Sequence, residues 1–422
     1  MTPSDPTHPL SPKQGELFLP LLDVLREQSR PLRPSDVYER VADKLNLPTD
    51  VREHQVSTCA GSTRTLDRNI RWAQQRAKLM GYVASPERNL WEITEQGRNA
   101  LANARPGIVV TIFESDNGVA LWAESQSAVT LIDDGTVDAV ITSPPYPLLH
   151  KKAYANQFAG AEHAEWLFER AKQWHRILND TGSLFLNLGD VWLPGMPAMD
   201  LYQERLLIKL VDGLGFHLNQ RLIWHNPSKL PAPAEWVTVR RCRVTPATET
   251  VFWLGKANPH RTKADNRKVL RPYSAAMKKL IADGGQSSAN RPSGYTFKSG
   301  KFGRDNGGAI AHNILSFANT ASNDSYQTYC RASQLPPHPA RFPSELVEWL
   351  LKLTTDVGDL VVDDFGGSFQ TAAVCEQMNR RWISCEKSLT YLRGGYGRFA
   401  ANPNARLHLN AQQLRPNKIH LQ

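Results

Sequence analysis

The chain has 422 residues, of which 41% are hydrophobic and 22% are charged, proportions that exclude a disordered or collagen-like protein. Its length exceeds what one ordinary hydrophobic core accommodates, so we expect two or three domains. No apolar run reaches the ~20 residues of a membrane helix. The first twelve residues lack the apolar region of a secretory signal. We therefore expect a cytoplasmic protein that makes no membrane contact.

The cysteines and the charges narrow the class further. The five cysteines are odd in number, scattered and without a CxxC pair, so neither a disulfide framework nor a metal site is expected. The net charge is +9; residues 226–335 hold 17 Lys or Arg and 6 Asp or Glu, a difference of +11, which leaves −2 for the rest. Concentrated positive charge suggests nucleic acid as a partner, and a solvated basic surface is the alternative.

Residues 1–14 are expected to form a disordered tail, and residues 15–105 a small, mostly helical unit with apolar residues at helical spacing. The predicted elements are helices over 17–25, 34–45 and 66–80, short strands over 82–84 and 90–93, and a last helix from Thr94. Three helices followed by a two-stranded wing describe a winged helix, which serves either DNA binding or protein contact. Charge does not decide between these, because residues 1–105 hold 15 basic and 13 acidic residues.

After a linker at 104–107, apolar β-type runs alternate with helical stretches. The predicted strands are 119–123, 139–142, 183–187, 221–224, 250–254, 360–363 and 382–386, and the predicted helices are 161–178, 201–214, 344–355 and 371–380. Strands separated by helices predict an α/β fold with a mostly parallel sheet covered on both faces. From 256 to about 335 this pattern is lost and basic, Gly and polar residues dominate, which indicates an insertion built for contact.

The first motif, residues 142–146, directly follows a predicted strand. Pro144 and Pro145 fix the backbone and donate no N–H, so their carbonyl groups are free to accept hydrogen bonds. Ser143 adds a hydroxyl group and Tyr146 a flat ring with a polar end. At the carboxyl end of a strand, where α/β sheets bind ligands, this set could hold an amino group and stack on its heterocycle. The alternative is a plain proline-rich turn.

The second motif, residues 360–368, is a buried strand followed by an acidic, Gly-rich turn at the start of a helix. Gly366 and Gly367 permit close backbone approach by a ligand. About twenty residues later, Glu386 ends the next strand and is placed to bind a ribose diol. The turn lacks the GxGxxG pattern, so a dinucleotide site is not favoured.

Together, Ser143–Tyr146 and the turn from Asp363 to Ser368 resemble the DNA amino-methyltransferases that use S-adenosylmethionine. The order of the motifs, catalytic first, resembles their permuted beta group. Residues 142–148, 151–156 and 338–343 are similar to N4-cytosine methyltransferases of restriction–modification systems, and residues 71–97 resemble the Mrr-like winged-helix module. The resemblance implies a Rossmann-like methyltransferase with a catalytic half (108–255), a target-recognition insertion (256–335), a cofactor-binding half (336–405) and a C-terminal tail (406–422).

The same resemblance implies the residues of the site. The catalytic group is Ser143, Pro144, Pro145 and Tyr146. The cofactor group is Glu124, Phe342, Ser344, Asp363, Phe365, Gly366, Gly367, Ser368 and Glu386. The DNA-binding group is Lys151, Lys152, Arg240, Arg241, Arg243, Lys263, Arg267 and Lys268. Two departures from the family pattern stand out: Ala123-Glu124 where Gly-Asp is usual, and Phe369-Gln370 where small residues are usual.

Three tryptophans are interpreted by their positions in the predicted elements. Trp166 and Trp174 fall at helical spacing and are predicted to lie in the core. Trp224 ends a predicted strand and is predicted to contact the substrate. Cys375 and Cys385 are expected in the core.

The resemblance implies transfer of a methyl group from S-adenosylmethionine to the N4 amino group of a flipped cytosine in double-stranded DNA, without a metal. It further implies a prokaryotic, nucleoid-associated protein that protects host DNA from a cognate restriction endonuclease. Adenine N6 methylation, methylation of RNA or of a protein amide, and a winged-helix regulator with an inactive methyltransferase body remain alternatives. A homodimer also remains open.

Overall fold

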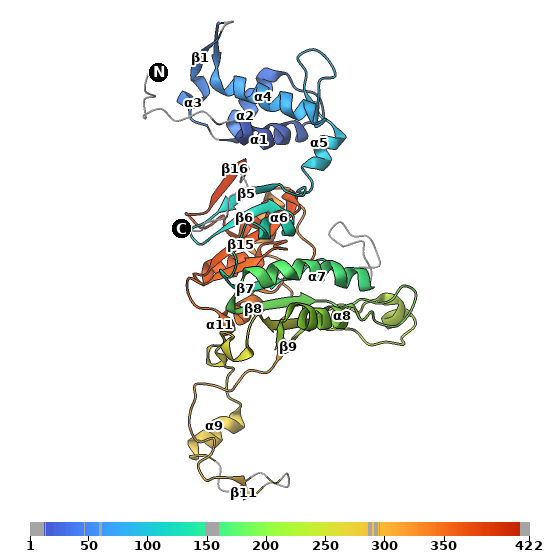
Figure 1. Cartoon of the computed structure of the whole chain (residues 1–422), viewed down its shortest axis with the longest axis vertical. Helices are drawn as coiled ribbons and strands as arrows, with labels where there is room; N and C mark the ends of the chain where they lie inside the picture. The colour runs from blue at the N-terminus through green and yellow to red at the C-terminus, as the bar shows by residue number, and fades with distance from the viewer. Residues whose placement is uncertain are drawn as a thin grey trace.

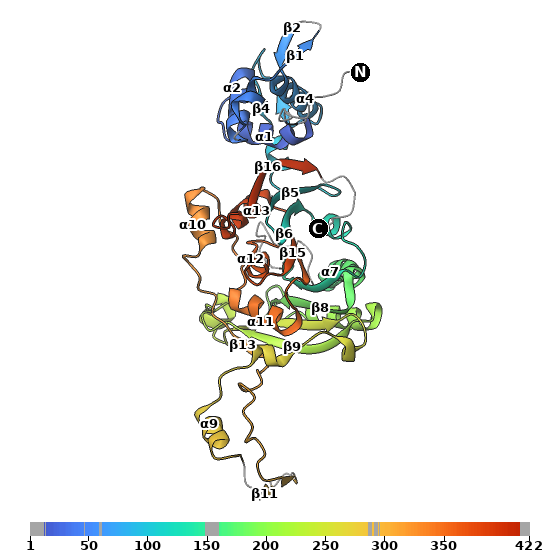
Figure 2. The same cartoon turned by 90° about the vertical axis from the view of Figure 1, so that its left-hand side faces the viewer.

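The computed structural model describes residues 12, 14–45, 47–58, 61–147, 160–285, 289–290, 294 and 296–413. Three parts follow one another along its long axis: an N-terminal unit, a central sheet domain and a projecting arm (Figure 1; Figure 2). Among the helices of these residues, none is long and apolar enough to cross a membrane.

The N-terminal unit contains the predicted winged-helix elements. Its helices are α1 (Gln14–Arg26), α2 (Pro34–Lys44), α3 (Thr49–Glu53), α4 (Thr65–Leu79) and α5 (Glu95–Ala100), and its hairpins are β1 (Gln55–Thr58) with β2 (Gly61–Arg64) and β3 (Val83–Ala84) with β4 (Glu92–Ile93). Gly81, with φ +74°, lets the chain leave α4 for the wing. The Thr94 hydroxyl accepts the N–H of Gly97 at 3.0 Å and caps α5. Helix α3 and the β1–β2 hairpin were not predicted, because four- and five-residue elements carry little periodicity.

The central domain is a ten-stranded sheet in the order β13-β9-β10-β8-β7-β14-β15-β6-β5-β16. Its strands are β5 (Val109–Glu114), β6 (Gly118–Ala123), β7 (Val137–Thr142), β8 (Leu178–Leu188), β9 (His217–His225), β10 (Thr248–Gly255), β13 (Ile314–Ser316), β14 (Leu360–Asp363), β15 (Arg381–Glu386) and β16 (Arg406–Gln413). Neighbours from β8 through β6 pair in parallel, as predicted. The flanking pairs β10–β8, β10–β9, β5–β6 and β16–β5 are antiparallel. The strand of the first motif, β7, therefore lies beside the strand of the second motif, β14.

Helices cover both faces of the sheet, and each face has its own apolar core. The helices on one face are α6 (Ser125–Val129), α7 (Gly160–Ile177) and α8 (Tyr202–Ile208), the last continuing into a π-helical turn, η1 (Lys209–Gly213). Those on the other face are α11 (Ser344–Thr354), α12 (Gln370–Gln377) and α13 (Leu389–Gly395). Cys375 and Cys385 are buried in these cores, as predicted.

Two expected boundaries are corrected by strand pairing. Residues 406–413, expected to belong to a tail, form β16 and pair with β5. Residues 314–316 of the expected insertion form β13, the edge strand of the sheet, which pairs in parallel with β9. Helix α10 (Ser325–Ala332) then packs against α13 and the short helix η5 (Tyr396–Arg398). The contact-building part of the insertion is therefore shorter than expected.

The arm leaves the sheet after β10 and extends away from the rest of the molecule in both views (Figure 1; Figure 2). The first two short helices after β10, η3 (Pro259–Arg261) and η4 (Asn266–Val269), stay close to the sheet domain, and η4 packs on α11. The arm itself carries α9 (Ala275–Ala282), β11 (Ala289–Asn290) and β12 (Thr296–Phe297). Helix α9 has no buried side chain. Residues 270–313 contain seven Lys or Arg and two Asp, so the arm is basic.

The N-terminal unit docks on the sheet domain. Helix α1 packs against β16, and the apolar core of the unit is continuous with the core beneath α11 to α13. Asp23, which is 2% exposed, forms an ion pair with Arg393 of α13. Asp23 also lies 3.4 Å from Arg26 of its own helix, so Arg393 supplies the contact to this buried carboxylate that comes from the sheet domain. Loss of Arg393 would weaken the pairing of a buried charge, so this contact helps fix how the unit sits.

Phe113 of β5 provides a test of the core under the N-terminal unit. Its ring is fully buried and lies 5.1 Å from Phe399 and 5.3 Å from Phe369 between centroids. We expect Phe113→Ala to lower the free energy of unfolding by about 3–5 kcal/mol, because it leaves a cavity. Val357→Ala, at a side chain that is 70% exposed, should change it by less than about 0.5 kcal/mol. Urea denaturation followed by tryptophan fluorescence measures both, and equal values for the two variants would contradict the packing described.

Candidate active site

A cavity of about 420 Å³ opens where four parallel strands, β6, β7, β14 and β15, have their carboxyl ends. Ligands of α/β sheets bind at this edge. The lining residues are Asn103, Ala123, Glu124, Ser125, Gln126, Ser143, Pro144, Pro145, Tyr146, Trp166, Arg170, His338, Ala340, Asp364, Phe365, Glu386, Lys387, Ser388 and Tyr391. Both sequence motifs thus meet in one cavity.

The Gly-rich turn after β14 packs tightly against β15. A Cβ atom on Gly366 would lie 2.3 Å from the Ser384 hydroxyl oxygen, so only glycine fits there. The Gly367 N–H donates to one carboxylate oxygen of Glu386 at 3.0 Å, and the Ser388 N–H donates to the other at 2.7 Å. Burial raises the pKa of Glu386 to about 7. The acid predicted to bind a ribose diol is therefore held in the cavity wall by two backbone N–H groups.

Two neighbouring carboxylates join this turn to the first motif. The Thr142 hydroxyl lies 3.0 Å from Asp363 and 3.2 Å from Asp364. Asp364 also accepts hydrogen bonds from the Ser125 hydroxyl and from the Trp174 indole N–H at 2.9 Å. Burial raises the pKa of Asp363 to about 7 and raises that of Asp364 as well. Asp364, which was not predicted, faces the cavity, whereas Asp363 lies beneath it and braces the turn through the Phe365 N–H at 3.2 Å.

Tyr146 is the centre of a hydrogen-bond network. Its hydroxyl donates to Glu249 at 2.9 Å, accepts from the Asn187 amide at 2.8 Å and lies 3.1 Å from the Ser143 hydroxyl. Lys229 binds the other oxygen of Glu249 at 2.7 Å. Burial, and then the charge of Glu249, raise the pKa of Tyr146 well above its usual value, so the hydroxyl stays protonated.

The Tyr146 ring packs directly against the backbone of Gly189. A Cβ on Gly189 would lie 2.6 Å from the Tyr146 ring. Four residues around this ring were not predicted from the sequence: Asn187, Gly189, Lys229 and Glu249. The available indication was that Asn187 interrupts the apolar run 184–188 of β8; Glu249 lies between two threonines at the start of β10 and carries no such signal.

Two aromatic side chains differ from their predicted places. Trp174 is fully buried as predicted, but Trp166 is only half-buried and lines the cavity, with the Arg170 guanidinium 4.5 Å above its ring. Trp224, predicted to contact substrate, is 4% exposed, and its indole N–H donates to the Phe317 carbonyl at 2.9 Å. Trp224 is therefore a core residue, because its side chain points to the face covered by α11.

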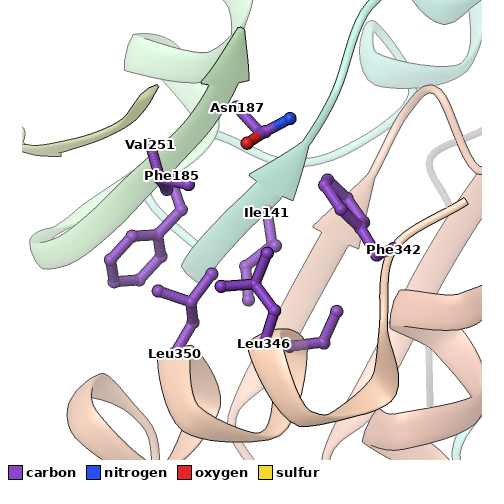
Figure 3. A pocket seen from close by; sticks show the side chains of 8 residues that line it. Ile141, Phe185, Asn187, Val251, Phe342, Leu346 and Leu350 are labelled. Atoms are coloured by element: carbon purple, nitrogen blue, oxygen red, sulfur yellow. The ribbon is translucent and has the colours of Figure 1, made fainter. Parts of the chain in front are cut away.

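Phe342 and Ser344, expected near the cofactor, also lie elsewhere. Phe342 packs on Trp224 and, with Ile141, Leu346 and Leu350, surrounds an apolar space that has no room for a water molecule (Figure 3). Ser344 is exposed and bonds Glu345 at 3.0 Å. Two residues that come earlier in the chain, His338 and Ala340, line the cavity instead. Residues 338–343 therefore lie beside the site, but the residues of this segment that face the cavity are not the ones predicted.

The departure at Phe369 is explained by packing. Its backbone is left-handed, with φ +58°, and its fully buried ring packs on Phe113 at 5.3 Å. A Cβ on Gly395 would lie 2.4 Å from that ring, so the ring fills space behind the turn. The large residue therefore points away from the cavity and does not reduce it.

The predicted DNA-binding residues fall into two groups. Arg240, Arg241 and Arg243 are exposed on the 226–247 loop between β9 and β10. Because Thr250 of β10 pairs with Leu188 at the end of β8, this loop lies at the same edge of the sheet as the cavity. Lys151 and Lys152 lie outside the described residues.

The second group, Lys263, Arg267 and Lys268, lies at the opposite edge. Lys263 binds Asp359 at 2.5 Å and Lys268 binds Asp356 at 2.5 Å, and both acids precede β14. Arg267 binds Asp265 at 2.8 Å. Lys263 and Lys268 thus bind carboxylates of the sheet domain on the side away from the cavity, whereas the Arg267 side chain is 83% exposed. The phosphate contacts predicted for these three residues stay a prediction.

The N-terminal unit has a second concavity, of about 690 Å³, between α2, α4 and the wing. Its lining includes Arg33, Arg71, Arg88 and Tyr38. The Tyr38 hydroxyl accepts a hydrogen bond from the Arg71 guanidinium at 2.6 Å. The exposed face of α4 also carries Trp72, which is 57% exposed. The groove is lined by four arginines and two acids, Asp67 and Glu87. Clustered arginines and exposed aromatic rings are features of nucleic-acid contact.

Within the described ranges, no group of three or more His, Cys, Asp or Glu side chains could hold a metal ion.

The titration of Glu386 provides a test of the site. Its pKa is raised in the fold, so its contribution to stability is fully present below about 4.5 and is lost as the pH rises through about 7.

We therefore expect the free energy of unfolding of the wild type to fall relative to that of Glu386→Gln, by roughly 2 kcal/mol between pH 5 and pH 8. Urea denaturation at both pH values measures this difference. Glu345→Gln, at an exposed carboxylate of α11, is the matched control and should show no such change. A difference between wild type and Glu386→Gln that does not vary with pH would rule out the raised pKa.

Comparison with known proteins agrees with this geometry. The family model described as DNA methylase matches residues 137–396, and the model of the Mrr N-terminal domain matches residues 15–103. The type II methyltransferase M.PvuII of Proteus hauseri is 39% identical over 293 residues, which cover 69% of this chain and 86% of that protein. The DNA adenine methyltransferase YhdJ of Escherichia coli K12 is 22% identical over 319 residues, which cover 74% of this chain and 90% of that protein.

A solved structure matches as well. The PvuII DNA methyltransferase, described as cytosine-N4-specific, superposes with a TM-score of 0.55 and 32% identity, covering 72% of this chain and 91% of that one. The matched family segment contains the Ser143–Tyr146 motif, the Gly-rich turn and Glu386. The chain therefore belongs to the DNA methylase family, and its N-terminal unit matches the Mrr N-terminal domain.

Proposed function

We propose that the chain transfers the methyl group of S-adenosylmethionine to the N4 amino group of a cytosine in double-stranded DNA. The observation that carries this proposal is the Tyr146 network. It fixes a hydroxyl group, a proline carbonyl and an aromatic ring at one end of a cavity whose wall also holds Glu386 and the Gly-rich turn. The relative M.PvuII, whose structure is described as cytosine-N4-specific, supports the choice of base.

The lining of the cavity fits the cofactor. Glu386 offers a carboxylate to the two hydroxyl groups of a ribose. Gly366 lets the turn pack against β15, which keeps Phe365 and Glu386 together in the cavity wall. Phe365 and Trp166, with rings 5.9 Å apart, supply an apolar wall. When bound, the cofactor supplies an electrophilic methyl group, and that group has to lie next to Ser143 and Tyr146 for reaction.

The residues of the first motif would prepare the amine for attack. The Ser143 hydroxyl oxygen and the Pro144 carbonyl accept hydrogen bonds from the amino hydrogens, which directs the nitrogen lone pair toward the methyl group. Tyr146 stacks on the flipped base. The new nitrogen–carbon bond forms as the sulfur–carbon bond breaks, and the amine loses a proton that becomes acidic after methylation. The products are N4-methylcytosine, S-adenosylhomocysteine and a proton, so no metal or covalent cysteine is required.

Basic segments on both sides of the cavity would hold the DNA. Three arginines, Arg240, Arg241 and Arg243, lie at the catalytic edge of the sheet. The basic arm projects beyond β13 (Figure 2), and the N-terminal unit has its own groove lined by arginines. Side chains of these kinds contact phosphates, which gives affinity without sequence choice. A cognate restriction endonuclease and a homodimer remain predictions.

Adenine N6 is the second candidate target, because the relative YhdJ is a DNA adenine methyltransferase. Nucleoside mass spectrometry on mixed-sequence DNA, incubated with the protein and methyl-labelled S-adenosylmethionine, decides between them. We expect label in N4-methylcytosine. Label in N6-methyladenine would overturn the choice of base. Bound cofactor without label in either nucleoside would instead favour a DNA-binding regulator.

Tyr146 allows the role of the ring to be separated from that of its hydroxyl. We expect Tyr146→Ala to lower the rate of methyl transfer by about 100-fold, because base stacking is worth ~1–3 kcal/mol, while the Kd for S-adenosylhomocysteine stays within about twofold. Tyr146→Phe is the matched control, since it keeps the ring and should retain about a tenth or more of the rate. Single-turnover assays with labelled cofactor measure both rates. A wild-type rate in Tyr146→Ala would remove Tyr146 from the mechanism.

A further inference from the structure

The cofactor cavity is lined in part by the N-terminal unit. Residues 101–104, which we term the strap, follow α5 and run beside the turn after β15. The Ala104 N–H donates to the Lys387 carbonyl at 2.8 Å, and the Leu389 N–H donates to the Ala102 carbonyl at 3.3 Å. Between these bonds, Asn103 lies opposite Ser388 in an antiparallel bridge. The strap therefore adds one short strand to the rim of the cavity.

From this bridge, Asn103 contributes to the cavity wall. Its residue is exposed, and no described group forms a hydrogen bond with its carboxamide. Lys387, beside it, binds Glu124 at 2.7 Å. An amide that can both donate and accept thus lines the same cavity as Glu386, the carboxylate predicted to bind the ribose.

We propose that the carboxamide of Asn103 binds the adenine ring of the cofactor, which makes the N-terminal unit part of the cofactor site. This inference rests on the proposed function. In the cofactor, ribose lies between adenine and the sulfonium. With ribose at Glu386 and the methyl group at Ser143, adenine lies on the other side of Glu386, where Lys387 and Ser388 meet the strap. The edge of adenine presents one donor and one acceptor side by side, which an asparagine carboxamide matches.

Helix α13 makes the same connection a second time. Ser388 caps this helix, Tyr391 lines the cavity, and Arg393 forms the ion pair with the buried Asp23 of α1. One short helix therefore contacts both the cofactor cavity and the N-terminal unit. The docking contact and the cavity wall therefore lie within one turn of the same helix, on different residues.

The test compares two ligands that differ only at the adenine: S-adenosylhomocysteine and its inosine analogue, which has an oxygen in place of the 6-amino group. Isothermal titration calorimetry gives both Kd values for wild type and Asn103→Asp. At the edge formed by the 6-amino group and N7, an aspartate still accepts from the amino group of adenine but meets only acceptors on the inosine analogue. The ratio of inosine to adenosine Kd should therefore rise about tenfold. Asn99→Asp, at an exposed residue of α5 outside the cavity, should leave the ratio unchanged.

Two results would overturn the inference: an unchanged ratio with unchanged Kd values, or an equal rise of both Kd values, which indicates only a structural role of the strap. Glu386→Gln separates this from failure of the proposed function. It should weaken both ligands alike. If the wild type binds neither ligand, or Glu386→Gln binds both as well as wild type does, the cofactor site itself is wrong.

Discussion

The hydroxyl of Thr142 donates hydrogen bonds to Asp363 and Asp364, and so joins two strands whose residues are 221 and 222 positions apart in the chain. This contact lies at the point where β7 and β14 end side by side. Ser143 to Tyr146 leave from one strand, and the Gly-rich turn leaves from the other. The buried carboxylates keep both turns at fixed distance, because a buried polar group that loses its partner costs about 1–3 kcal/mol. Chain order is irrelevant to this arrangement, which is why a permuted sequence can build the same site.

From this joint, the two ends of the cavity differ in character. Around Tyr146, a tyrosine, an asparagine, a glutamate and a lysine bind one another, so a ring is held at a fixed angle. Around Glu386, a carboxylate is held by backbone N–H groups and remains available to hydroxyl groups. The first end suits a planar base and the second suits a ribose. Positioning, rather than a strong base, is the main task of such a site.

The N-terminal unit and the arm lie at opposite ends of the sheet domain along the long axis (Figure 2). In the described part of the arm, α9 buries no side chain, so this helix is suited to packing onto a partner. The N-terminal unit has a full core that continues into the sheet domain. Its last residues form the rim of the cofactor cavity, so it is joined to the site more closely than a tethered module would be.

The fold class, the longer helices and strands, and the two motifs that meet in the cavity could be predicted from local sequence patterns, because apolar spacing and Gly or Pro turns act over neighbouring residues. Three features could be seen only in the folded chain. Polar residues of other strands reach Tyr146, Phe342 and Trp224 belong to the core, and Lys263 and Lys268 bind acids. The folded chain also shows that β16 and the strap complete the sheet domain. These outcomes depend on pairing between distant strands, which local sequence patterns do not encode.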